Sequence, residues 1–198
     1  MKTLVKHQEE AMNRLIKEKN LRDLGKMFGD ANEGVQCEWI ENHCSFTSVP
    51  RTDFNDDPDA SGFDLISPDG VKMKTQSKIR ATDIHLATTR RKSKKNLGDV
   101  SIDGHVSYSS GEFDVLLISR PLGNKATRND SYPCTARPIE EYPNVETWEM
   151  IAIPEVELHD HKRPGYLFNN VPKGIWGQYV GRASEVLEEV YESISNRR

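Results

Sequence analysis

Residues 63–80 constrain the fold more than any other segment, because their pattern predicts two strands and the turn between them. Residues 71–80 alternate apolar or small side chains with polar ones, which is the two-residue period of a strand with unlike faces. The preceding residues 67–70 contain a proline that fixes φ and a glycine that permits a positive φ. Residues 63–66 are short and strand-like. The segment therefore predicts a β-hairpin whose second strand has a basic, polar face, formed by Lys72, Lys74, Gln76, Lys78 and Arg80.

Helices are predicted at both ends of the chain. Residues 4–28 place apolar side chains at helical spacing, and Gly29 and Asp30 are predicted to end this helix. Residues 33–44 follow as a weaker helical or mixed segment. Residues 183–194 repeat apolar side chains at three- and four-residue intervals, which predicts an amphipathic helix at the C-terminal end.

The middle of the chain is predicted to be mostly strand. Residues 113–119 are apolar on both faces, which is typical of a buried central strand, and residues 148–153 and 166–171 are further strand candidates. Strands between terminal helices predict an α/β or α+β fold. The length suits one domain over residues 1–198, divided into a helical N-terminal part (1–45), a core (60–120) and a C-terminal helix (180–198).

The charge of the chain is unevenly distributed. Its 27 Lys and Arg side chains and 31 Asp and Glu side chains give a net charge of −4, which by itself disfavours a polyanionic partner. Residues 72–95, however, contain nine Lys or Arg side chains and one Asp, a net of +8, so the remaining residues carry −12. A positive band in an otherwise acidic protein can bind a polyanion.

Composition argues against a membrane or exported protein. No apolar run approaches the roughly 18 residues of a membrane span. The charged N-terminal segment lacks the apolar core of a signal peptide. The three cysteines are an odd, sparse set that suits a reducing compartment better than a disulfide scaffold. We therefore expect a cytoplasmic protein with no membrane partner.

Three chemically different side chains are expected to converge on the polar face of the hairpin. Asp64 points to the face opposite its neighbours in the first strand, and Gln76 and Lys78 share one face of the second strand. The short turn brings the two strands side by side. A carboxylate, an amide oxygen and an ammonium group can therefore meet at one place.

This arrangement resembles the motif of the PD-(D/E)xK nuclease superfamily. Asp64, eleven intervening residues and then Gln76-Ser77-Lys78 match it in a variant that has Gln at the second acidic position. Residues 62–78 are similar to the family's first strand, turn and catalytic strand, and residues 111–121 to its next core strand. The resemblance spans roughly residues 33–120. It implies a restriction-endonuclease-like fold, with a central mixed sheet flanked by helices, and phosphodiester hydrolysis with Mg²⁺, for which Mn²⁺ can substitute.

The resemblance also implies a role for each residue. Asp64 is the main metal ligand and Gln76 adds a neutral amide oxygen. Lys78 holds the attacking water or stabilises the charge that develops on the phosphate. Because Gln contributes less charge than the usual Asp or Glu, an acidic ligand from an upstream helix is expected to compensate. Glu38 and Glu41 are the two candidates for this ligand.

Basic and amide side chains on and after the second hairpin strand are candidates for DNA binding. Lys and Arg suit contacts with phosphates, and Arg and Asn also suit the edges of guanine and adenine. The predicted DNA-binding residues are Lys74, Arg80, Arg90, Arg91, Lys92, Lys94, Lys95, Arg120, Lys125, Arg128 and Asn129.

Within this superfamily, the single-domain length favours a sequence-specific type II restriction endonuclease that cuts double-stranded DNA. Such enzymes typically act as homodimers, because two-fold protein symmetry matches a palindromic site. Two alternatives stay open. One is a structure-specific repair, recombination or phage nuclease. The other is a non-catalytic DNA-binding protein in which Gln76 marks a degraded nuclease site.

Overall fold

A five-stranded mixed sheet organises the part of the chain that the structure describes. The structure is a computed structural model, and it describes residues 21–50, 63–79, 84–86, 108–121 and 148–197. The sheet has the order β1-β2-β3-β5-β6. Neighbouring strands are antiparallel except β3 and β5, which are parallel. The strands are β1 (Thr47–Pro50), β2 (Phe63–Ile66), β3 (Lys72–Ile79), β5 (Val115–Pro121) and β6 (Trp148–Pro154).

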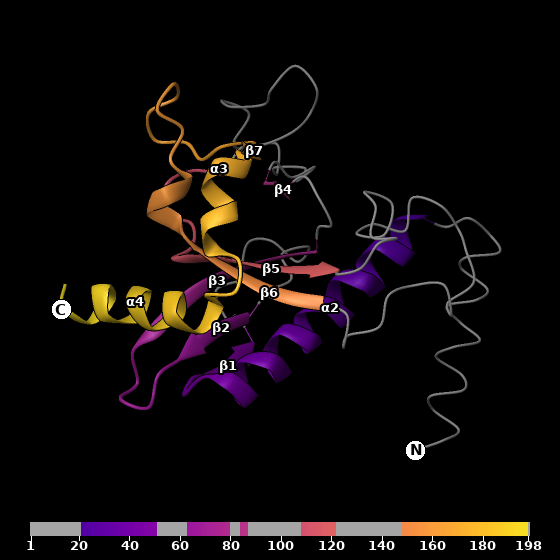
Figure 1. The fold of residues 1–198 in the computed structure, drawn as a ribbon. Coiled ribbons are helices and arrows are strands. Elements are labelled where there is room, and N and C mark those ends of the chain that lie inside the picture. The colour runs from indigo at the N-terminus through magenta and orange to yellow at the C-terminus, as the bar shows by residue number, and fades with distance from the viewer. Residues whose placement is uncertain (1–20, 51–62, 80–83, 87–107, 122–147, 198) are drawn as a thin grey trace, which may run out of the picture.

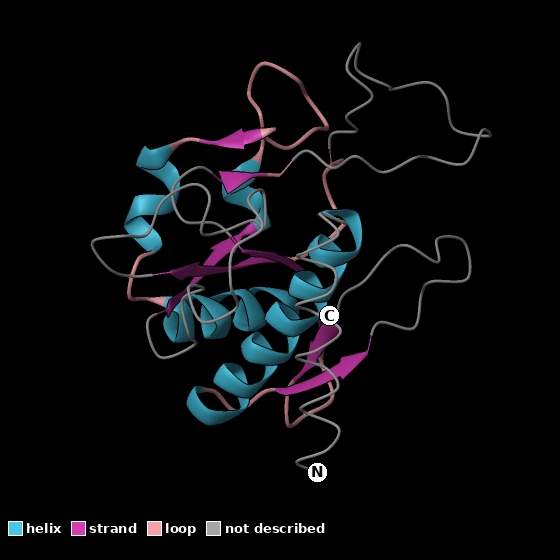
Figure 2. Ribbon diagram, turned by 90° about the vertical axis from the view of Figure 1, so that its right-hand side faces the viewer, coloured by secondary structure: helices cyan, strands magenta, loops and turns pink. Residues whose placement is uncertain are grey.

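Helices and short elements cover the two faces of this sheet. The long helices α2 (Leu21–His43) and α4 (Ala183–Ser195) lie on one side (Figure 1, Figure 2). The other side carries α3 (Lys173–Trp176) and a two-stranded sheet formed by β4 (Ile84–His85) and β7 (Asn170–Val171). Two 3₁₀ helices, η5 (Glu155–Leu158) and η6 (Gly177–Tyr179), complete the described elements. The predicted α+β class is confirmed.

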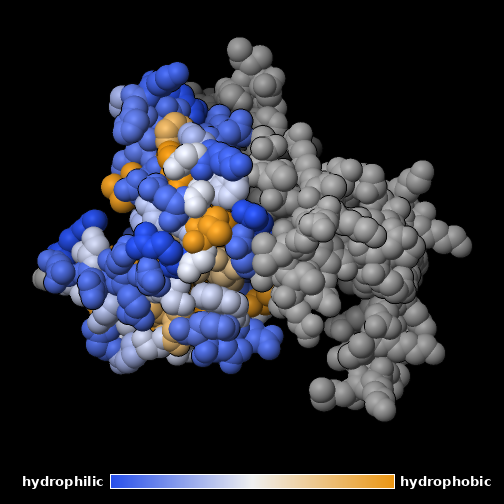
Figure 3. Space-filling view, in the orientation of Figure 1, coloured by the Kyte–Doolittle hydropathy of each residue, from blue (hydrophilic) through white to orange (hydrophobic). Residues whose placement is uncertain are grey.

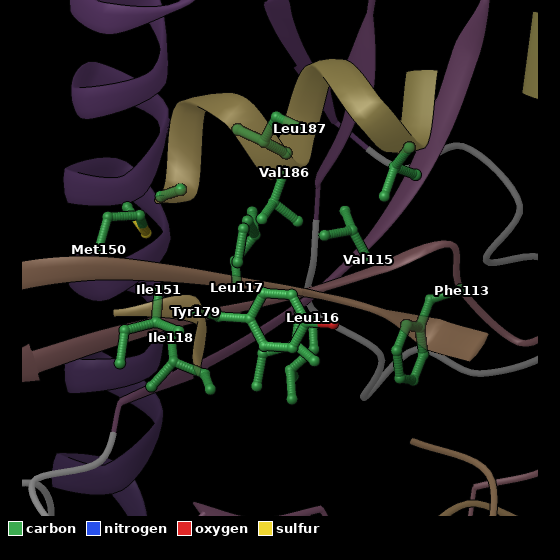
Figure 4. Close-up of a cluster of buried hydrophobic side chains, with 14 of the residues drawn as sticks. Phe113, Val115, Leu116, Leu117, Ile118, Met150, Ile151, Tyr179, Val186 and Leu187 are labelled. Carbon is green, nitrogen blue, oxygen red and sulfur yellow. The ribbon is translucent and has the colours of Figure 1, made fainter. Parts of the chain in front are cut away.

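The central strand β5 is buried on both faces, as its sequence predicts. Figure 4 shows Leu117 on the side of α4, toward Val186 and Leu187, whereas Leu116 and Ile118 point to the opposite side. All five of these side chains are fully buried. A strand that is paired on both edges and covered on both faces has no polar face, which explains its continuous apolar run.

Helix α2 continues through Gly29 and Asp30, so the predicted helix end at this point is wrong. The buried positions that follow are Asn32, Gln36 and Ile40, spaced four residues apart along one side of the helix. Two of these three buried residues are polar, so the helix beyond Gly29 lacks the apolar repeat from which an amphipathic helix is predicted. One glycine within a helix costs only about 1 kcal/mol relative to alanine, an amount that packing readily offsets. The predicted helical residues 4–20 lie outside the described residues.

Two further strand predictions differ from the structure. The four-residue strand β1 was not predicted, because it falls between a helix and the polar loop expected at residues 50–62. In the predicted strand 166–171, only Asn170–Val171 pairs as a strand. Tyr166 and Leu167 instead form isolated bridges with two different segments, at Ser109 and His159. The strands predicted at 63–66, 71–80, 113–119 and 148–153 are all confirmed within one or two residues.

The hairpin turn between β2 and β3 is fastened to the C-terminal helix. Gly70 has φ +83° and donates its amide to the Ser67 carbonyl at 2.9 Å, which closes the expected turn. The Asp69 carboxylate accepts hydrogen bonds from the Ser67 hydroxyl and, at 2.9 Å, from the Tyr191 hydroxyl of α4. These two bonds, that of Ser67 first, hold the pKa of Asp69 below its ordinary value. The same carboxylate raises the pKa of Tyr191.

Replacing Tyr191 by Phe is expected to lower the melting temperature at neutral pH, because Asp69 loses a donor. Because its pKa is lowered, the Asp69 carboxyl stabilises the folded protein at pH values above its ordinary pKa of 3.8. This stabilisation is lost as the pH falls through the lowered pKa. Because its pKa is raised, Tyr191 stabilises the folded protein at pH values below its ordinary pKa of 10.0. This stabilisation is lost as the pH rises through the raised pKa. Thermal unfolding of the wild type and of Tyr191→Phe, at pH values from below the pKa of Asp69 to above that of Tyr191, measures the difference in melting temperature. Equal melting temperatures at neutral pH would contradict the role of this bond.

Candidate active site

The register of the hairpin places Asp64 among polar side chains of β3. Asp64 lies directly opposite Lys74, and directly opposite residues of an antiparallel pair share a face. Lys72 and Gln76 lie two residues to either side of Lys74, so both are diagonal neighbours of Asp64 on that face. Lys78 lies one further step along the same strand. The pairing of the strands therefore places the three residues on one face, with Lys78 four residues beyond the position opposite Asp64.

The Asp64 side chain is fully buried and forms an ion pair with a lysine. Lys72 Nζ lies 2.9 Å from Asp64 Oδ2, and the Thr75 amide donates to Oδ1 at 3.4 Å. A carboxylate removed from water is costly unless it is paired and hydrogen-bonded. Lys72 is thus the counter-ion of Asp64 in this structure, a role that the sequence analysis did not predict.

Gln76 is largely buried, although the pattern places it on the basic, polar face of β3. Its amide nitrogen donates to the Ser77 carbonyl at 3.2 Å. Among the described residues, none donates a hydrogen bond to its amide oxygen. This oxygen is therefore suited to bind a cation or a water molecule.

The ammonium group of Lys78 is directed by an aromatic ring. Lys78 Nζ lies 5.6 Å from the centroid of the Tyr108 ring, within the range of a cation–π interaction. Tyr108 is buried and meets Phe113 edge-to-face, with ring centroids 5.6 Å apart. Tyr108 could not be predicted from the sequence, because no local pattern connects a residue before β5 to the end of β3.

Helix α2 forms hydrogen bonds with the end of β3, on the face of the sheet opposite to the one that bears Gln76. Asn32 Nδ2 donates to Ser77 Oγ at 2.8 Å. The fully buried Gln36 donates to the Lys78 carbonyl at 3.3 Å and to Ser119 Oγ on β5 at 3.0 Å. Ser77 and Gln76 are adjacent in a strand and point to opposite faces. These buried polar side chains therefore hold the backbone that carries Gln76 and Lys78.

The two glutamates proposed as the compensating ligand lie on this helix and are exposed. Glu41 accepts a hydrogen bond from Ser48 Oγ of β1 at 2.8 Å. Within the described residues, no group of three or more His, Cys, Asp or Glu side chains could hold a metal ion. The structure therefore does not gather Glu38 or Glu41 with Asp64 into a three-carboxylate cluster.

The residue types at Asp64 and Gln76 can be compared with the ligands that Mg²⁺ prefers. Asp64 and Gln76 supply a carboxylate and an amide oxygen, and both are hard ligands. Mg²⁺ keeps several waters and is commonly bound by one or two carboxylates together with phosphates of the substrate. Asp64 and Gln76 are ligands of these types, and they are diagonal neighbours on one face of the hairpin.

The predicted DNA-binding residues that the structure describes differ in availability. Lys74 is exposed on the face that bears Asp64. Arg120 is held within the fold, because its Nε lies 3.0 Å from Glu149 Oε1 and its guanidinium lies 5.4 Å from the Trp176 ring centroid. The remaining predictions lie outside the described residues, and these are Arg80, Arg90, Arg91, Lys92, Lys94, Lys95, Lys125, Arg128 and Asn129.

A second polar cluster joins Ser110, His159 and Glu155, which are the residue types of a hydrolase triad. His159 Nε2 lies 3.0 Å from both Ser110 Oγ and Glu155 Oε2. A catalytic triad uses the two different ring nitrogens of histidine, one for the nucleophile and one for the acid. Glu155 also accepts a hydrogen bond from the Gly111 amide at 2.9 Å. The cluster therefore fastens the segment before β5 to η5.

Comparisons with known protein families, with curated proteins and with solved structures find no match to this chain. No helix among the described residues is long and apolar enough to cross a membrane. The motif and the geometry of the hairpin are therefore the features of the chain that bear on its function.

Proposed function

We propose that this protein is a Mg²⁺-dependent endodeoxyribonuclease with a restriction-endonuclease-like fold. The observation that carries the proposal is the shared face of the hairpin, on which buried Asp64 lies between Lys72 and Gln76, with Lys78 further along the strand. A fully buried carboxylate beside an amide oxygen and several lysines is unusual for a solvated strand face. It suits the binding of a divalent cation and a phosphate together.

The topology supports the same proposal. The sheet is mixed, with antiparallel β1, β2 and β3 followed by β5 parallel to β3, and helices flank it. The helix α2 precedes the hairpin, and the buried strand β5 follows the strand that carries Gln76 and Lys78. These features agree with the fold that the PD-(D/E)xK resemblance implies.

In the proposed mechanism, each of these side chains has a different role in phosphodiester hydrolysis. Asp64 and Gln76 would hold Mg²⁺, which neutralises a phosphate and lowers the pKa of a bound water. Lys78, directed by Tyr108, stabilises the negative charge that develops on the phosphate oxygens. Lys74 and the basic residues of segment 80–95 bind neighbouring phosphates of the duplex, a contact that salt weakens.

Within this class, we infer a type II restriction endonuclease that acts as a homodimer on palindromic double-stranded DNA. The face of the described residues that Figure 3 shows is mostly hydrophilic. Among all the described residues, the exposed large hydrophobic side chains are Val156 and Val180. One observation favours the non-catalytic alternative. The ion pair with Lys72 gives the buried Asp64 carboxylate a counter-ion without a metal.

A plasmid digest distinguishes these functions. Incubation of the full chain with supercoiled plasmid and Mg²⁺ is expected to give discrete fragments, and chelation of the metal is expected to stop the reaction. A smear would favour a structure- or end-directed nuclease. Binding without cleavage, in both Mg²⁺ and Mn²⁺, would favour the DNA-binding protein.

A further inference from the structure

Lys72 and Asp64 differ in how freely they can move. Asp64 has no exposed side-chain surface, whereas 35% of the Lys72 side chain is exposed. A lysine has a flexible four-carbon stem and a strongly hydrated ammonium group. If the ion pair opens, the partner that leaves is therefore Lys72, because it can move into water while Asp64 stays within the sheet.

The position of Asp64 between two diagonal neighbours gives it two alternative partners. On one side lies Lys72, whose ammonium contacts Oδ2 at 2.9 Å. On the other side lies Gln76, with which Asp64 would share a metal ion. A divalent cation and an ammonium group repel each other, so both cannot contact the same carboxylate oxygen at close range.

We infer that Lys72 is a positioning residue that competes with a divalent cation for Asp64. This inference rests on the proposed function, because it concerns the metal site of the same hairpin. In the metal-free protein, Lys72 neutralises the buried carboxylate. When the cation binds, Lys72 withdraws toward solvent on the face that also bears Lys74, where a phosphate of the substrate can accept its charge. Lys72 therefore weakens metal binding in the absence of DNA.

The test measures the binding of Mn²⁺ to the protein in the absence of DNA. The electron paramagnetic resonance signal of free Mn²⁺ reports how much of the ion is bound. Lys72→Met removes the competing charge and keeps the aliphatic stem, so Mn²⁺ is expected to bind about tenfold more tightly than to the wild type. Lys72→Arg keeps the charge and is expected to retain the wild-type affinity. Lys173→Met, on an exposed position of α3, controls for the change in net charge and is expected to bind as the wild type does.

Thermal unfolding gives a second readout. Without Lys72 the buried carboxylate lacks its counter-ion, so metal-free Lys72→Met is expected to melt at a lower temperature and to gain more from Mn²⁺ than the wild type. If Lys72→Met does not fold, Lys72→Gln takes its place, because glutamine still donates a hydrogen bond to Asp64.

Unchanged or weaker Mn²⁺ affinity in the folded variant would overturn the role of Lys72, and so would an absence of Mn²⁺ binding to both proteins. The outcome is separable from that of the plasmid digest. Cleavage by the wild type with unchanged affinity in the variant supports the nuclease and overturns the competition. Tighter binding by the variant without any cleavage supports the competition and overturns the nuclease.

Discussion

Asp64→Asn is expected to reduce the rate of plasmid cleavage by about 10³-fold or more, because it removes the charged ligand of the proposed metal site. The substitution keeps the shape of the side chain, and Lys72, which loses its ion pair with Asp64, has a partly exposed side chain that can extend into water. We therefore expect the variant to fold and to bind DNA in Ca²⁺. Single-turnover cleavage rates in Mg²⁺, with circular dichroism to monitor folding, measure the effect.

The matched control is Asp69→Asn, in the turn that follows the same strand. Asp69 stands directly after Pro68, so it is the literal Pro-Asp pair of this segment. Its carboxylate accepts hydrogen bonds from Ser67 and Tyr191, and we expect its replacement to affect stability while cleavage is retained. A reversed result, with Asp64→Asn active and Asp69→Asn inactive, would move the metal site to the turn.

Lys78→Met is expected to lower kcat by about 10²- to 10³-fold with little change in KM, because in the proposed mechanism the Lys78 ammonium acts on charge that appears only in the transition state. The methionine keeps a long apolar side chain beside Tyr108. Lys78→Arg, which keeps the positive charge, is expected to restore part of the activity. Steady-state kinetics on a short duplex separate kcat from KM.

Lys74→Met provides the contrast on the same strand. Lys74 is exposed and is expected to bind the phosphate backbone equally in the ground and transition states. Its replacement should therefore raise KM and reduce the salt dependence of binding. A Lys78→Met variant that behaves in this way, with raised KM and normal kcat, would assign Lys78 to DNA binding rather than to catalysis.

Local sequence patterns were sufficient to predict the hairpin and the central strand. The period of two in residues 71–80 and the turn residues before them depend only on near neighbours, and both appear in the structure. The same pattern predicted that Asp64, Gln76 and Lys78 share a face. It did not predict which β3 residue lies opposite Asp64, and that register is what gives Asp64 a lysine as its partner.

The rest of the site depends on contacts between distant segments, which local patterns do not encode. Tyr108 reaches Lys78 from the segment before β5, and Gln36 reaches the Lys78 carbonyl from α2. The extent of α2 was also mispredicted, because Asn32 and Gln36 are polar yet buried. Their buried positions are explained by hydrogen bonds to β3 and β5, and these exist only in the folded protein.

The parallel pairing of β3 with β5 has a consequence for the order in which the site forms during folding. The Thr75 amide donates to Asp64 across 11 residues of chain, whereas the Lys74 amide donates to Asp114, immediately before β5, across 40 residues. Closing the longer loop costs about 1 kcal/mol more in chain entropy, so the hairpin is expected to form first. Asp64, Lys72 and Gln76 belong to this early unit. The contacts of Lys78 with Tyr108 and Gln36 form only when β5 and α2 pack against the hairpin. The residues proposed to bind the metal are therefore expected to be placed before the residue proposed to stabilise the transition state.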